Sequence, residues 1–259
     1  KVEVGTLNRF QEIFQNKGEQ AQKMILPRVK SLAIDDNDNI VFIAKNDSRI
    51  FQISPDGVLK TLAGTGTFPP QNNLDGVLAI ENDFPTLNSI LFSNEGDLLV
   101  NEANPLSDRP TLRVIDKSTN RLSSIANFEA TPWDLKLGAD GKLYYISSQA
   151  NVSRFDPTTG VTEDIIGSST AGFAGDGGPA SEASLNMFNN GAVAIAPNGD
   201  IFIADFVNHR VRRVYPNQLG VLEIETIAGT GNTNFLDKKG PALEANLEYP
   251  SRLVSDKRG

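Results

Sequence analysis

Cysteine is absent from the 259-residue sequence, and histidine occurs only once. Without cysteine the chain forms no disulfide bridge, has no thiolate nucleophile and offers no sulfur ligand for zinc. One histidine also cannot supply a metal site that needs several imidazole ligands. These two absences remove common metal and nucleophile chemistries, while the redox compartment stays open.

Long apolar runs and an excess of basic charge are missing as well. No segment approaches the roughly 18 apolar residues of a membrane span, and the opening KVEVGTLNRF lacks the apolar core of a signal peptide. If the protein is exported, its signal lies upstream. Lys and Arg number 24 against 32 Asp and Glu, so the net charge is −8. Because polyanion binding depends on Lys and Arg neutralising phosphates, nucleic acid is not an expected partner.

What the sequence does contain is one unit written four times. Each copy has a short apolar strand, a turn of Gly, Asn or Asp and a second apolar strand, which together form the signal of a β-hairpin. One apolar residue of the first strand serves as the reference residue of each copy: Ile34, Phe92, Leu137 and Ile195. These residues are spaced by 58, 45 and 58 positions, and another apolar residue lies six positions after each of them. A third and a fourth strand follow in each copy, as in 210–214 and 225–231.

Four antiparallel strands in repeats of this length, with almost no helix signal, predict an all-β fold of the β-propeller class. A β-sandwich is the alternative, but it would not require the same register at four places. We expect complete blades at about 28–66, 86–126, 131–167 and 190–231, with partial blade strands at 1–6 and 250–259. Since a closed ring hides its sheet edges and the shared blade lacks its middle strands, we expect a segment of a longer parent chain.

The fourth repeat resembles the NHL repeat. The resemblance rests on NGAVAIAPNGDIFIADFVNHRVRRV (190–214), and AGFAGDGGPASEASL and IAGTG resemble linkers of bacterial-type members of that family. The resemblance is strong over 167–250, good over 27–66 and degenerate over 85–166, where the Asn-His-Arg motif is missing. The resemblance implies a ring of six blades in the complete protein, and a binding role more often than an enzymatic one.

Three long linkers join the outer strand of one blade to the inner strand of the next. Each carries a Phe, then Asp and Gly, then Ala, at about 67–81, 172–182 and 234–244. Such insertions gather on one face and often mark the binding face, so Phe173 and Asp176 are candidate ligand contacts. The alternative is structural: Phe68, Phe173 and Phe235 would each plug a groove between blades.

Calcium is the one cofactor left open, because Asp and backbone carbonyl oxygens are hard ligands. However, Asp176-Gly177-Gly178 lacks the dense Asp and Asn spacing of a calcium loop, and Asp-Gly is first of all a turn signal. The tract 35–39 is richer in oxygen ligands but occupies a hairpin turn. We therefore expect no resident cofactor.

The single histidine, His209, lies between the second and third strands of the fourth repeat. That position predicts a turn role for His209, with Asp205 interacting with a neighbouring strand or an arginine. Because side chains alternate across a strand, Arg210 and Arg212 share one face and Arg213 takes the other. No Gly-x-Ser-x-Gly nucleophile elbow lies nearby, and no catalytic residue is assigned. RNA binding would need a basic patch at these arginines.

Trp133, the only tryptophan, comes just before an inner strand, and with Asp134 it is a further candidate ligand contact; packing between blades is the alternative. The sequence thus predicts a non-catalytic binding module, extracytoplasmic or at the cell surface, whose loop face takes a protein or carbohydrate ligand. The alternative function is a calcium-dependent hydrolase of the six-bladed lactonase or esterase type. Its candidate oxygen ligands fall in different registers and define no coordination set. They are Asn88, Asn101, Glu102, Asp134 and Asn190.

Overall fold

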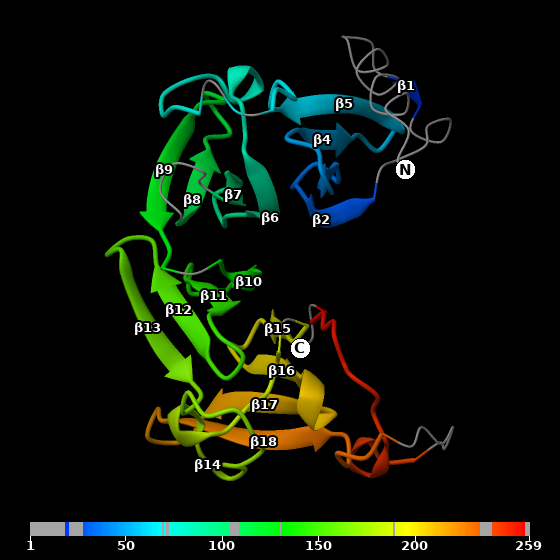
Figure 1. Ribbon diagram of the computed structural model, residues 1–259, viewed down its shortest axis with the longest axis vertical. Helices are drawn as coiled ribbons and strands as arrows, with labels where there is room; N and C mark the ends of the chain where they lie inside the picture. The colour runs from blue at the N-terminus through cyan, green and yellow to red at the C-terminus, as the bar shows by residue number, and fades with distance from the viewer. Residues whose placement is uncertain are drawn as a thin grey trace. The chain divides into compact units, whose positions relative to one another are not determined.

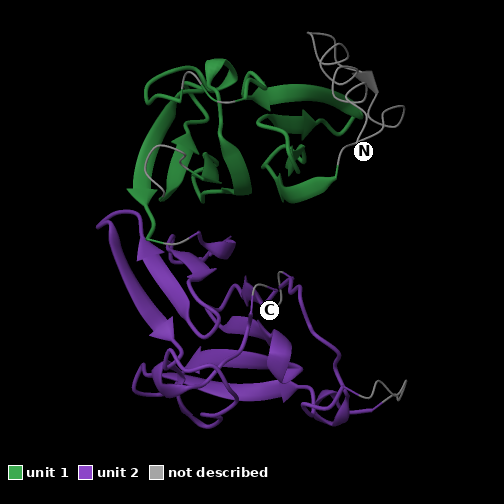
Figure 2. Cartoon of the chain, in the orientation of Figure 1, with its two compact units in different colours: residues 1–129 green, residues 130–259 purple. Residues whose placement is uncertain are grey.

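The computed structural model describes residues 19–20, 28–68, 70, 73–103, 109–129, 131–188, 190–233 and 240–256. Antiparallel strands in four sheets make up most of this part of the chain (Figure 1). The helical elements in these residues are four 3-10 turns of three residues each, η2 to η5. Two compact units divide the chain, residues 1–129 and 130–259, and each unit contains two of the sheets (Figure 2).

The first unit contains a sheet of order β1-β5-β4-β3-β2 and a sheet of order β6-β7-β8-β9. The strands of the first sheet are β1 (Glu19–Gln20), β2 (Val29–Ile34), β3 (Ile40–Ala44), β4 (Ile50–Ile53) and β5 (Val58–Ala63). Those of the second sheet are β6 (Thr86–Phe92), β7 (Leu98–Ala103), β8 (Pro110–Ile115) and β9 (Leu122–Asn127). In the second sheet each strand thus pairs with the one that follows it.

The second unit repeats this plan with the orders β10-β11-β12-β13 and β14-β18-β17-β16-β15. Its first sheet comprises β10 (Trp133–Leu137), β11 (Leu143–Ile146), β12 (Val152–Asp156) and β13 (Val161–Ile166). Its second comprises β14 (Gly178–Pro179), β15 (Ala192–Ile195), β16 (Ile201–Asp205), β17 (Arg210–Pro216) and β18 (Leu222–Ala228). The short strand β14 belongs to a linker, which is thereby added to the outer edge of its sheet.

The repeat register seen in the sequence is the register of the strands. Each reference residue pairs across the hairpin with the apolar residue six positions on. These pairs are Ile34 with Ile40, Phe92 with Leu98, Leu137 with Leu143, and Ile195 with Ile201. Because strand side chains alternate between the two faces, this register fixes which residues share a face in every sheet.

Each unit has a core between its two sheets. In the first unit Val41 and Ile43 of β3 pack in one cluster with Leu98 and Val100 of β7. In the second unit residues of β11 and β12 pack with Ile203 and Val214 in the same way (Figure 1). These side chains are almost fully buried. Burial of apolar area on facing sheets is therefore the main stabilising contribution within each unit.

The linkers return to their sheets through one repeated set of backbone hydrogen bonds. The amide of Gly64 donates to Ala79 O, that of Gly167 to Ala180 O and that of Gly229 to Ala242 O, at 2.8, 2.9 and 3.0 Å. The accepting alanines begin η2 (Ala79–Glu81), η3 (Ala180–Glu182) and η5 (Ala242–Glu244). All three glycines have positive φ, and a Cβ on Gly229 would lie 2.3 Å from His209 O. Only glycine fits this turn without moving the backbone.

Partial blade strands were predicted at the two ends of the chain. The strand predicted at 1–6 lies outside the described residues, as do 257–259. Residues 250–256 form no paired strand, although their side chains alternate between half-buried and exposed from 251 onward. An inner strand pairs with the second strand of its own sheet, and the described residues supply no such partner here.

Candidate functional site

Asp176 and Arg212 fasten a linker to the last sheet. The guanidinium of Arg212, fully buried on β17, donates to Asp176 Oδ1 at 2.6 Å and to Ala174 O at 3.3 Å. It also pairs with the fully buried carboxylate of Asp205 at 3.5 Å. Thr226 completes the contact by donating to Asp176 Oδ2 at 2.7 Å. We call Asp176, Asp205 and Arg212 the second linker triad.

The same arrangement occurs in the first unit. Arg113 on β8 donates to Asp75 Oδ1 at 2.8 Å and pairs with the buried Glu102 at 3.4 Å. Arg113 also donates to Leu74 O at 2.8 Å. By strand register Arg113 is equivalent to Arg212, and Glu102 is equivalent to Asp205. We call Asp75, Glu102 and Arg113 the first linker triad.

Burial has the same effect on the carboxyl group at the centre of each triad. It raises the pKa of Glu102 and of Asp205 above the usual range, against the opposing influence of hydrogen bonds and the nearby arginine. The largest lowering contributions come from hydrogen bonds, from Asn73 to Glu102 and from the Asn186 amide to Asp205. A raised pKa in a cleft can mark catalysis, but here burial accounts for the rise, and each carboxyl group is part of a structural ion pair with its arginine.

Phe173 lies beneath two arginines of the same sheet. The guanidinium carbon of Arg210 is 3.7 Å from the centre of the phenyl ring, and that of Arg212 is 5.0 Å away. Cation–π contacts of this kind hold the linker to the sheet. Phe68 in the first linker is 73% exposed, so the expectation of a shared groove plug is wrong for Phe68. Phe235 lies outside the described residues.

His209 has the turn role that its position predicted. It adopts a left-handed conformation, with φ 54° and ψ 42°, after η4 (Phe206–Asn208). Its Nδ1 accepts a hydrogen bond from the amide of Tyr249 at 3.3 Å, and the two rings meet edge to face at 4.5 Å. Asp205, the acid nearest in sequence, accepts from the Asn186 amide at 2.7 Å and is committed to Arg212. His209 therefore anchors the C-terminal segment.

The three arginines after His209 divide as strand alternation requires. Arg210 and Arg212 contact Phe173, whereas Arg213 pairs with Asp200 at 2.6 Å and with Glu225 at 3.2 Å. The charges of Arg212 and Arg213 are thus matched by carboxylates, so no triple-arginine pocket forms.

Trp133 and Asp134 are adjacent in sequence but have different roles. Asp134 accepts from the Val193 amide at 2.7 Å and from the Lys136 ammonium at 2.6 Å, which ties β10 to the inner strand β15. Ser31 makes the equivalent bond in the first unit, accepting from the Ile90 amide at 3.2 Å. Trp133 pairs with Ile146, and 37% of its surface remains exposed.

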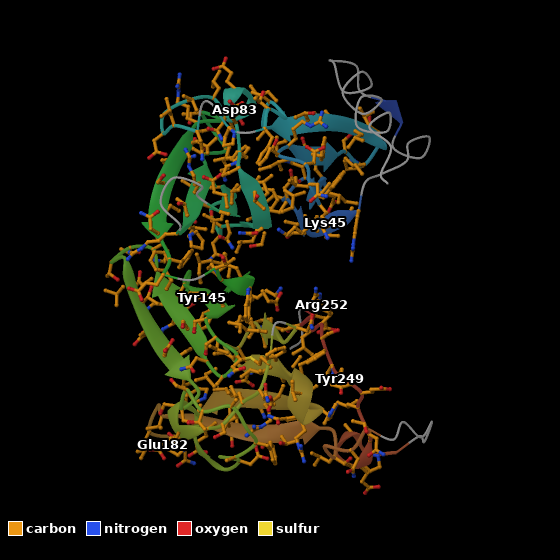
Figure 3. The ribbon with its side chains drawn as sticks, viewed as in Figure 1. Lys45, Asp83, Tyr145, Glu182, Tyr249 and Arg252 are labelled. Atoms are coloured by element: carbon orange, nitrogen blue, oxygen red, sulfur yellow. The ribbon has the colours of Figure 1, made fainter. Side chains whose placement is uncertain are left out.

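Further aromatic residues are present where the inner strand begins and the second strand ends. Phe188 precedes β15 and is 56% exposed, while Phe206 follows β16. Tyr249 is 46% exposed and lies 5.0 Å from Phe206, ring centre to ring centre, on the C-terminal segment beside η4 (Figure 3). Because β10 and β15 are joined by Asp134 near their starts, these positions belong to one end of the two sheets. We call Trp133, Phe188, Phe206 and Tyr249 the aromatic rim.

Sequence reasoning identified one of these four residues. The sequence does not mark Phe188, Phe206 and Tyr249, because none of them belongs to a repeated motif. The available signal was position: Phe188 precedes β15, Phe206 follows β16, and Tyr249 precedes the inner strand predicted from residue 250. Aromatic residues at such ends are candidates even where no motif marks them.

The residues considered as calcium ligands do not converge. The side chain of Asn88 accepts from the Lys30 ammonium at 3.0 Å, and Asn101 donates to Ser89 at 3.4 Å. Glu102 and Asp134 are held by the cations already named. Among the described residues no group of three or more His, Asp or Glu side chains is arranged to hold a metal ion. Nor does any helix in these residues have the length and apolar character to cross a membrane.

Comparison with known proteins supports the architecture and little more. No protein-family model and no curated protein matches the chain. An auxiliary nutrient binding protein from Bacteroides thetaiotaomicron VPI-5482 is similar in structure, with 14% identity, a TM-score of 0.53 and coverage of 90% of this chain and 65% of that one. Another, from Bacteroides ovatus ATCC 8483, has 15% identity, a TM-score of 0.52 and coverage of 84% and 46%. Virginiamycin B lyase from Staphylococcus aureus has 10% identity, a TM-score of 0.49 and coverage of 80% of this chain and 58% of that one.

At such identities the likeness concerns the fold alone. Together with the four antiparallel sheets, it places the chain in the β-propeller class, as the repeat predicted. The chain spans less than two thirds of the length of each of these structures. Membership of the NHL-repeat family stays a prediction.

Proposed function

We propose that this chain is a non-catalytic binding module whose loop face takes a carbohydrate ligand. The observation that carries the proposal is the aromatic rim, in which Trp133, Phe188 and Tyr249 keep 37 to 56% of their surface exposed on one end of the second unit. Aromatic rings offer a large, rigid apolar face with little conformational entropy to lose, which suits stacking on the C–H face of a sugar. A protein ligand would use the same rings.

The polar groups near the rim favour binding over catalysis. Three groups beside it that could act as acid or base have structural partners: His209 holds Tyr249, Asp205 holds Arg212, and Asp134 holds Val193 and Lys136. Two structural neighbours are described as auxiliary nutrient binding proteins, which agrees with a binding role at an extracytoplasmic site or the cell surface. We further propose that Phe173 and Asp176 act indirectly, by holding the linker beside the rim.

The test uses the only tryptophan of the chain as its own reporter. Maltohexaose, xylohexaose and cellohexaose are titrated while Trp133 emission is followed, and affinity is confirmed by calorimetry. A bound sugar should shift the emission, and Trp133→Ala or Tyr249→Ala should weaken binding by roughly three- to tenfold, the equivalent of about 0.5–1.5 kcal/mol for one aromatic contact.

Phe68→Ala is the matched control, because Phe68 is an exposed aromatic residue in a linker of the other unit. It should leave the affinity unchanged. The proposal is refuted if none of the sugars changes the emission or the heat, or if Phe68→Ala weakens binding as much as the rim variants. Capture of a protein through the rim residues in place of sugar would reassign the ligand class.

A further inference from the structure

Three basic side chains gather where β2 begins and β3 ends in the first unit. The amide of Lys45, the residue after β3, donates to Arg28 O at 2.8 Å, so these two residues are cross-strand neighbours. Lys30 follows within β2, and besides partial burial the charge of Lys45 helps to lower the pKa of Lys30. All three residues are exposed, and Lys45 lies beside β2 in Figure 3. We call Arg28, Lys30 and Lys45 the basic corner.

Lys30 is fixed in place rather than freely mobile. It is the extra residue of a β-bulge, since Val29 pairs with Ala44 and Ser31 with Ile43. Its ammonium donates to Leu87 O at 2.7 Å and to Asn88 Oδ1 at 3.0 Å on β6. An ammonium has three N–H donors, so one remains for a further acceptor. Bulges commonly re-aim a side chain in this way.

The basic corner has no carboxylate partner. None of its three residues forms an ion pair in the described part of the chain, whereas seven other basic residues there do. Those seven are Arg49, Arg113, Lys136, Lys142, Arg154, Arg212 and Arg213. Lys60 and Arg121 also form no ion pair in this part of the chain, so the basic corner is distinguished by the grouping of three such residues in a protein of net charge −8. Partial burial, followed by the charge of Lys45, lowers the pKa of Lys30, so the unmatched charges oppose one another.

The basic corner occupies the positions that the aromatic rim occupies in the second unit. Lys30 stands four residues before Ile34, as Trp133 stands four before Leu137. Lys45 follows directly after β3, as Phe206 follows β16. The same strand ends thus present aromatic faces in one unit and unpaired cations in the other.

From this placement we propose that the basic corner binds the oxyanion of an acidic saccharide, a carboxylate or a sulfate group. Ammonium and guanidinium donors form charge-assisted hydrogen bonds to such oxygens, and a bound anion would offset the repulsion between the neighbouring cations. The inference rests on the proposed carbohydrate function and adds an acidic group to the ligand chemistry, through residues of the first unit alone.

The experiment compares charged and neutral forms of one sugar on the full chain. Trigalacturonic acid, its methyl ester, galactose 6-sulfate and inorganic sulfate are titrated by calorimetry at low and high salt. The acid should bind about tenfold more tightly than the ester at low salt, in line with the strength of a hydrogen bond to a charged group. Raising the salt should reduce this difference.

Two variants and one control identify the site. Lys45→Gln and Arg28→Gln should each lower affinity for the acid roughly five- to tenfold and leave that for the ester unchanged, because neither side chain makes a hydrogen bond within the described residues. Lys60→Gln, in the exposed part of β5, is the control and should have no effect. Thermal melts should show all three variants folded.

The outcomes separate this inference from the proposed function. Equal affinity for acid and ester, or an effect of Lys60→Gln as large as that of Lys45→Gln, overturns the oxyanion site while sugar binding itself stands. Failure of every sugar to bind removes both. Inorganic sulfate that binds as tightly as either acidic sugar would show a free-anion site and refute the saccharide assignment; otherwise the tighter acidic sugar identifies the group.

Discussion

Replacing Arg212 with methionine tests whether the second linker triad holds the linker to its sheet. Methionine retains much of the apolar stem but removes the charge, so the fully buried carboxylate of Asp205 loses its cation and Asp176 loses a 2.6 Å contact. Removing one partner of a buried ion pair costs about 3–5 kcal/mol. Asp205 keeps its hydrogen bonds from the Asn186 amide and the Asn208 side chain, at 2.7 and 2.8 Å. We therefore expect a loss near the lower end, about 3 kcal/mol.

Urea unfolding followed by Trp133 emission measures this loss by linear extrapolation, because Trp133 lies in the same unit as the triad. Arg154→Met is the control, since the pair of Arg154 with Glu163 is partly exposed and should contribute less than about 1 kcal/mol. The double variant with Asp205→Asn removes the stranded charge. It should recover more than about 1 kcal/mol of the loss, as coupling energies within such networks predict.

The pH dependence of the stability loss in Arg212→Met is an independent test of the same reasoning. Burial raises the pKa of Asp205, and removing Arg212 takes away a charge that lowers it. A carboxyl group whose pKa is raised on folding contributes stability below its unfolded pKa and loses it as the pH rises through the folded value. The deficit of Arg212→Met should therefore shrink as the pH falls below neutrality. A loss under about 1 kcal/mol, or one that neither Asp205→Asn nor acid reduces, would refute the reasoning.

Three further predictions concern the other buried contacts. Burial raises the pKa of Glu102, so this carboxyl group lowers the melting temperature as the pH rises from 4 to 7. Glu102→Gln should remove that contribution, and an unchanged dependence of the melting temperature on pH would argue against the raised pKa. His209→Ala should cost about 1 kcal/mol and speed amide hydrogen exchange at Tyr249, which then lacks its acceptor; unaltered exchange at that amide would contradict the anchoring role. Gly229→Ala should cost more than about 1 kcal/mol in urea unfolding, and clearly more than Gly199→Ala, whose added Cβ meets nothing within 4 Å.

The strands and their register could be predicted because they depend on local apolar alternation. The second and third sheets form in the region where the NHL wording is degenerate, since pairs such as Phe92 with Leu98 require only apolar residues at the right spacing. The linker triads could not be predicted from the sequence, because they depend on contacts between residues far apart in the chain. Arg113 and Asp75 are 38 residues apart, and their contact depends on how a linker folds back over the outer strand. Only the aligned register reveals that Arg113 and Arg212 are equivalent.

The candidate site was predicted in part. Trp133 was singled out at the start of an inner strand, and it is the first residue of β10, but the sequence did not distinguish its environment from that of Asp134. The β-bulge between Trp133 and Lys136 breaks the alternation that such a distinction needs. The ligand role of Trp133 stays a prediction, and Asp134 has a structural hydrogen bond that the sequence could not disclose.

The two linkers that carry the triads differ in length yet end on the same contacts. The interval from the turn glycine to the aspartate is two residues longer in the first linker (64 to 75) than in the second (167 to 176). Both aspartates nevertheless accept a hydrogen bond from the equivalent arginine. Four residues after its aspartate, each linker reaches the alanine that accepts the hydrogen bond from the turn glycine. Loop length between fixed anchors can therefore differ between linkers at little cost in stability. A library that varies only this interval would therefore change the linker and leave the sheets as they are.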